Sequence, residues 1–100
     1  MISANDKVVL IQWKMNLLKR AIDTYGVDKQ IDMLIEECAE LIVALKHMKR
    51  GRVAWNEVAE EMADVKIMID QFHTIDTVSD AIHNNEMIKL QRLEKRLNEK

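Results

Sequence analysis

Two short stretches of the chain concentrate carboxylates at spacings that could bind a metal ion. They contain Glu36, Glu37 and Glu40 in the first stretch, and Glu57, Glu60, Glu61 and Asp64 in the second. In an α-helix, at about 100° per residue, the first three side chains share an arc of about 100°, and Glu57, Glu61 and Asp64 form a second narrow stripe. Ligand sets made only of carboxylates suit Mg²⁺ or Mn²⁺ better than zinc.

The two acidic stretches are expected to lie at the same height on neighbouring helices. In an antiparallel hairpin centred near residues 52–53, Glu40 falls opposite about residue 65 and Glu37 opposite about residue 68. Like charges that converge in a partly buried site favour protonation, and a divalent cation would relieve this repulsion. The alternative is a solvated acidic face, which is the usual explanation for single acids at such spacings. Same-sign acids at matched height on two helices favour the metal site.

Helix-forming residues dominate the elements that must position these acids. The chain has no proline, and its two glycines, Gly26 and Gly51, are expected to end the first two helices. Helices are predicted from Asn5 or Asp6 to about Tyr25, from Asp28 to about Arg50, from Ala54 or Asn56 to about Thr74, and from just after Thr77 almost to Lys100, with Asp80 as a capping-box acid. Short loops between them predict a single all-α domain over residues 1–100, a four-helix antiparallel bundle-like protomer.

The composition indicates which partners the protein can bind and in which cellular compartment we expect it. The net charge of −2 argues against binding to a nucleic acid polymer. Cys38 is the only cysteine, so no internal disulfide can form. Without an apolar run of roughly 20 residues or a signal-peptide pattern, we expect a cytoplasmic protein that does not contact membranes. Such a short domain has a thin core, and apolar residues on several helix faces predict a homodimer or homotetramer.

The acidic motif resembles that of the MazG-type nucleotide pyrophosphohydrolases, members of the all-α NTP pyrophosphatase superfamily. Their motif is E-E-x-x-E, a spacer, and E-x-x-D, and this chain has Glu36-Glu37-x-x-Glu40, twenty residues, and Glu61-x-x-Asp64. The later K-x-x-R pattern of the family resembles Lys89-Leu90-Gln91-Arg92, although Leu93 stands where many members have asparagine. The resemblance covers roughly residues 30–96.

The resemblance implies an enzyme that hydrolyses canonical or aberrant nucleoside triphosphates to a monophosphate and pyrophosphate, in a housecleaning role. It implies Mg²⁺, with Mn²⁺ as a substitute, bound by Glu37, Glu40, Glu61 and Asp64, and Glu36 as the catalytic residue that handles the attacking water. Substrate contacts would come from Lys89, Arg92, Arg96 and Trp13. The competing interpretations are a solvated basic face for the three cations and a core position for the tryptophan.

Two other functions are also compatible with this sequence. Phosphoribosyl-ATP pyrophosphohydrolase shares the superfamily fold and a similar acidic motif. A non-catalytic helical dimerisation or regulatory module would use the acids only to solvate its surface. The sequence does not identify the base or sugar of a substrate.

Overall fold

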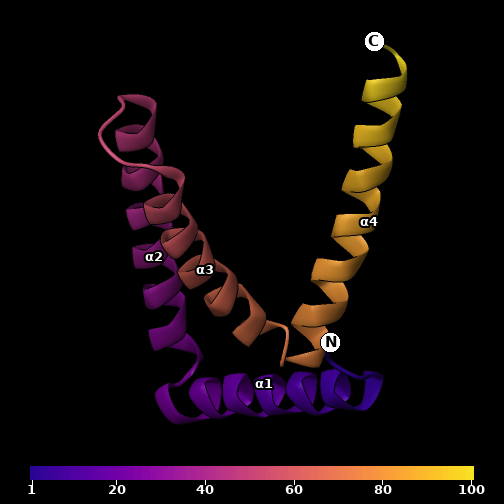
Figure 1. The fold of residues 1–100 in the computed structure, drawn as a ribbon. Coiled ribbons are helices and arrows are strands. Elements are labelled where there is room, and N and C mark those ends of the chain that lie inside the picture. The colour runs from indigo at the N-terminus through magenta and orange to yellow at the C-terminus, as the bar shows by residue number, and fades with distance from the viewer.

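The protein, described here over all 100 residues by a computed structural model, consists of four α-helices and no strands. The helices are α1 (Ala4–Tyr25), α2 (Val27–Lys49), α3 (Trp55–Phe72) and α4 (Asp76–Asn98) (Figure 1). The predicted all-α class is confirmed, and each helix begins and ends within one or two residues of its expected position.

The helix caps differ in part from the prediction. Ser3, rather than Asn5 or Asp6, caps α1: its hydroxyl accepts the Asp6 N–H at 3.1 Å, while the Asp6 carboxylate accepts the Ser3 N–H at 3.4 Å. Asp6 is therefore the acid of a capping box. The predicted capping role of Asp80 is wrong, because α4 begins at Asp76, too early for it.

Glycine fixes the first two helix ends as expected. Gly26 has φ 89° and is the single residue between α1 and α2, so α2 begins at Val27, one residue before the expected Asp28. Gly51 has φ 71° just beyond the end of α2. A side chain is strained at such positive φ values, which explains glycine at both turns.

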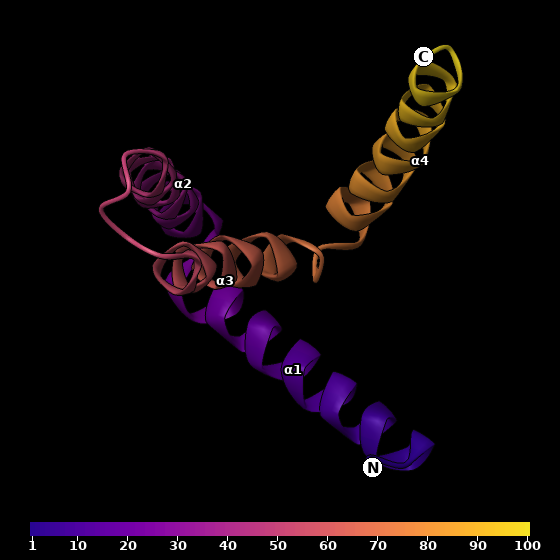
Figure 2. The same ribbon diagram turned by 45° about the horizontal axis from the view of Figure 1, so that its top comes forward.

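The first three helices pack together as a bundle-like unit. α2 and α3 form an antiparallel hairpin, and α1 crosses the end of that hairpin where α2 begins and α3 ends (Figures 1 and 2). Leu18 and Ile22 of α1 and Met68 of α3 are buried at this crossing. Val58, at the other end of α3, is the only fully buried side chain. Apolar contact therefore holds α3 near both of its ends.

Polar contacts reinforce the crossing. Gln30 of α2 donates to the side-chain oxygen of Gln71 of α3 at 2.6 Å, and both side chains are buried. Asp70 of α3 accepts from Lys14 of α1 at 2.9 Å and from Lys66 at 2.7 Å. Burial alone would raise the pKa of Asp70, but the hydrogen bonds and charges of these two lysines outweigh it and lower that pKa. The ion pairs fix α1 against α3.

The fourth helix leaves this unit. α4 has no buried residue and makes almost no contact with the other helices, so it stands apart in both views (Figures 1 and 2). The radius of gyration is accordingly 16.7 Å, whereas a compact domain of this length has about 13 Å. None of the four helices combines the length and apolarity needed to cross a membrane.

Candidate metal centre

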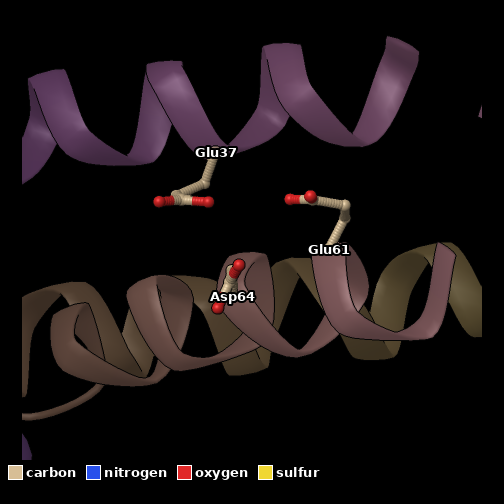
Figure 3. A group of neighbouring side chains, drawn as sticks. All are labelled: Glu37, Glu61 and Asp64. Carbon is tan, nitrogen blue, oxygen red and sulfur yellow. The ribbon is translucent and has the colours of Figure 1, made fainter. Parts of the chain in front are cut away.

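Three of the predicted acids converge between α2 and α3. Glu37 points from α2 toward α3, and Glu61 and Asp64 face it from α3 (Figure 3). One carboxylate oxygen from each of the three lies within 4.8 Å of the others. Glu61 and Asp64 share one face because three residues separate them on a helix, and the hairpin brings Glu37 to the same level.

The electrostatics of this acidic triad (Glu37, Glu61 and Asp64) are unfavourable without a cation. One oxygen of Glu37 and one of Glu61 are buried without any hydrogen-bond partner, although each side chain as a whole is half-buried. Burial raises the pKa of both carboxyls above the ordinary 4.5, and the charges of Glu40 and Asp64 raise it further. An unpaired buried acceptor costs stability, and a proton or a cation would supply the missing partner.

The other two acids of the motif occupy different positions. Glu40 is exposed and lies outside the triad, yet its charge acts on both Glu37 and Glu61. Glu36 is exposed on α2 and enters neither the triad nor the groove beside it. Neighbouring helix positions are about 100° apart, which explains why Glu36 and Glu37 face different surroundings.

A groove runs from the triad toward the turn between α2 and α3. It is lined by Ala39, Glu40, Val43, Ala44, His47, Val53, Glu57, Glu60 and Glu61. Sequence reasoning did not single out His47, although a usable signal exists. His47 follows Glu40 by seven residues, and a spacing of seven returns to nearly the same helix face. The groove therefore combines four small apolar side chains with four carboxylates and one imidazole.

The predicted substrate-binding residues do not meet the acids within one chain. Lys89, Arg92 and Arg96 lie together on the solvent-exposed α4, and no α4 residue lines the acidic groove. Trp13 of α1 is 60 % exposed and borders a small hollow with Asn16, Leu17 and Arg20, all from its own helix. The tryptophan is therefore not the core residue that its apolar stripe could suggest.

No match to this chain is found among protein-family models, curated proteins or solved structures. The chemistry of the site must therefore be inferred from the residues themselves.

The donor set fits a hard divalent cation. All the converging donors are carboxylate oxygens, Glu37 and Glu61 each also have one oxygen that is buried without a partner, and neither histidine nor cysteine belongs to the triad. Mg²⁺ and Mn²⁺ take such oxygen ligands and retain water in their remaining positions. Glu37, Glu61 and Asp64 could thus hold one cation directly, with Glu40 beside them.

Proposed function

We propose that the protein is a Mg²⁺-dependent nucleoside triphosphate pyrophosphohydrolase that releases pyrophosphate. The observation that carries the proposal is the convergence of Glu37, Glu61 and Asp64, with two buried oxygens that lack hydrogen-bond partners. A purely solvating set of acids would leave those oxygens in water. The triphosphate substrate is supported by the resemblance of the E-E-x-x-E and E-x-x-D motif to the MazG-type enzymes.

The residues divide the proposed chemistry between them. Glu37, Glu61 and Asp64 would hold Mg²⁺, and Glu40 would add negative charge beside them. When bound, the ion would offset the charge of the acids and polarise the phosphoryl oxygens of the substrate. These acids alone would repel a triphosphate, so substrate affinity should depend strictly on the cation.

The resemblance to the MazG-type enzymes assigns the general base to Glu36, although this residue lies outside the triad and the groove in the structure. Its exposed carboxylate would accept a proton from the attacking water, whose oxygen forms a bond to the α-phosphorus. The bond from the α-phosphorus to its bridging oxygen breaks, and pyrophosphate leaves with the electron pair. The products are a nucleoside monophosphate and pyrophosphate.

A substrate panel tests the proposal. The protein is incubated with the common ribonucleoside and deoxyribonucleoside triphosphates and with phosphoribosyl-ATP, with Mg²⁺ or with EDTA. Pyrophosphate and orthophosphate are measured separately. We expect pyrophosphate release from one or more nucleoside triphosphates only with Mg²⁺. Preference for phosphoribosyl-ATP would assign the rival substrate, and orthophosphate release alone would refute attack at the α-phosphorus.

Matched variants test the site. Glu61→Gln and Asp64→Asn each remove a charged ligand while keeping the shape of the side chain, and each should lower kcat/KM at least about 100-fold. Asp32→Asn is the control, because Asp32 is an exposed acid of the same helix as Glu37, about 140° around it. Full turnover by Glu61→Gln would overturn the assignment of the triad.

A further inference from the structure

A hollow at the crossing of the helices is lined by side chains from three of them. Its volume is about 450 Å³, and its lining comes from Tyr25 of α1, from Lys29, Gln30, Asp32 and Met33 of α2, and from Met68 of α3. Lys29 and Asp32 are exposed at its edge, and their opposite charges leave the hollow without a net charge. Sites for small molecules span about 300–1,000 Å³. The hollow therefore has the size of a site for a small uncharged group.

The inner side chains of the hollow suit an aromatic ring. Gln30 and Met68 are buried, with 5 % and 7 % of their surface exposed, whereas Met33 and Tyr25 border the opening. Methionine sulfur packs favourably against aromatic rings, and a tyrosine ring pairs with them by stacking or edge-to-face contact. Two thioethers and one phenol ring therefore favour a planar aromatic ligand over an aliphatic or a charged one.

The buried amide of Gln30 offers the hollow one hydrogen-bond acceptor. Its Nε2 donates to Oε1 of Gln71 at 2.6 Å, and Nε2 of Gln71 lies 3.4 Å from the sulfur of Met68, which fixes the orientation of the pair. Oε1 of Gln30 accepts no hydrogen bond within the chain. Only Glu37 and Glu61 have a fully buried side-chain oxygen without a partner, so Oε1 of Gln30 stays open to the hollow. A ligand that displaces water from this oxygen must supply a donor in its place.

A single acceptor between apolar walls selects among aromatic rings. An amino group on a ring can donate one N–H to Oε1 of Gln30 and turn its other N–H toward water. An N–H flanked by two carbonyl oxygens, as in uracil, would place those oxygens against methionine side chains that offer no donor, and this costs free energy. The hollow therefore favours a ring that carries an amino group.

The hollow lies beside the acidic triad. Met33 precedes Glu37 by four residues, and Met68 follows Asp64 by four. Each methionine is therefore on the same helix face as the acid, one turn nearer to α1, about 6 Å along the helix axis. In a nucleotide, one sugar separates the base from the α-phosphate. A single nucleotide can thus place its base in the hollow and its phosphates at the triad.

We infer that the hollow binds an amino-substituted aromatic ring, which among the nucleobases means adenine or cytosine, with Oε1 of Gln30 as the acceptor and Met33 and Met68 against the ring. The binding of the ring stands on the lining of the hollow alone. Its identity as the base of the triphosphate rests on the proposed function. Trp13, which the resemblance implies as a substrate contact, lies outside the hollow.

Methionine methyl resonances test the hollow without any need for activity. The seven methionines of the chain are labelled with ¹³C at the methyl carbon and assigned with methionine-to-leucine variants. Adenosine or cytidine is then added in EDTA. We expect the ring current of at least one nucleoside to shift the methyls of Met33 and Met68 and to leave that of Met87, on α4, in place. If neither nucleoside shifts the two methyls, or if Met87 shifts equally, the inference is wrong.

Matched ligands test the acceptor. Purine riboside lacks the amino group of adenosine, and pyrimidin-2-one riboside lacks that of cytidine. We expect the nucleoside that binds to have a Kd about tenfold lower than its analogue, because the analogue leaves Oε1 of Gln30 without a donor. Only the ligand changes in this comparison, so the fold of the protein is unaffected. Equal affinity of nucleoside and analogue would overturn the preference for an amino group.

A pair of substitutions tests the wall of the hollow. Met33 and Met87 are 39 % and 45 % exposed, so a charge at either position reaches water and the helix should persist, which circular dichroism checks. Met33→Glu should abolish the shift of the Met68 methyl, whereas Met87→Glu should retain it. A shift that survives Met33→Glu but disappears in Trp13→Ala would place the ring on α1 and overturn the inference.

Competition tests whether the ring is the base of the substrate. If it is, the nucleoside that binds the hollow should inhibit triphosphate hydrolysis competitively, raising KM and leaving kcat unchanged. Inhibition that lowers kcat at unchanged KM would overturn this identity and assign the hollow to a separate ligand. If the protein hydrolyses no triphosphate, the proposed function fails, and the methyl shifts still decide whether the hollow binds a ring.

Discussion

The buried amide pair at the crossing of the helices gives a sharp test of how the hairpin is held. Gln30 and Gln71 are each 5 % exposed and are joined by a hydrogen bond of 2.6 Å. Gln71→Leu would leave the Gln30 amide buried without its partner, which costs about 1–3 kcal/mol. Gln30→Leu should cost a similar amount. In the double variant no polar group is left unpaired, so its stability should lie within about 1 kcal/mol of the unaltered protein.

Thermal unfolding followed by circular dichroism measures this coupling. For a domain of this length, 1 kcal/mol corresponds to about 5 °C in Tm, so each single variant should melt about 10 °C lower. The double variant should recover most of that loss. Protein concentration must be the same across the series, because any association between chains would add to the measured stability. Losses that simply add in the double variant would refute the coupling, and single variants that lose nothing would show that both amides reach water.

Three further predictions concern charge and packing. In EDTA, Glu61→Gln should be more stable than the unaltered protein at pH 7. Because the pKa of Glu61 is raised, the folded state of the unaltered protein loses stability as pH rises above about 4.5. Urea titrations from pH 4 to pH 8 would reveal this loss, and equal stability of the two proteins throughout would contradict the repulsion among the acids. The pH dependence of stability that Asp70 contributes has the opposite sign, because the pKa of Asp70 is lowered. Asp70→Asn should cost about 1 kcal/mol at pH 7 in urea titrations extended well below pH 4. The difference should begin to fall near the ordinary pKa of 3.8 and vanish below the lowered pKa of the folded state. A cost that does not change with pH would exclude the ion pairs as its source. Val58→Ala removes two methyl groups from a side chain with 0 % exposure and should lower the free energy of unfolding by about 2–3 kcal/mol, as measured by urea unfolding. A loss below about 1 kcal/mol would mean that the surrounding residues close around the smaller side chain.

Helix positions and the meeting of the acids follow from local rules in the sequence. Glycines at positive φ ended the first two helices, and the spacing of Glu61 and Asp64 placed both on one face. A short turn then required α3 to return along α2, which brought Glu37 to them. The caps were harder to predict, because Ser3 and Asp6 share one capping box and either residue can look like the cap.

The position of α4 could not be read from the sequence. An apolar stripe such as that of Ile82 and Leu93 indicates that a face is covered, but the pattern is the same whether the cover comes from its own chain or from another. The resemblance implied that Lys89 and Arg92 contact the substrate near the acids, and this remains a prediction, because α4 does not reach the acidic groove of its own chain. The groove residue His47 was missed because the acidic motif ends before it.

The detached α4 also bears on how long a single chain survives. A newly made chain holds apolar residues of α4 between Val78 and Leu93 in water, and a helix with few tertiary contacts frays readily. Proteases cleave such transiently open segments, and chaperones bind their apolar side chains. Covering these apolar residues would close this route, so their exposure would govern how long a chain survives.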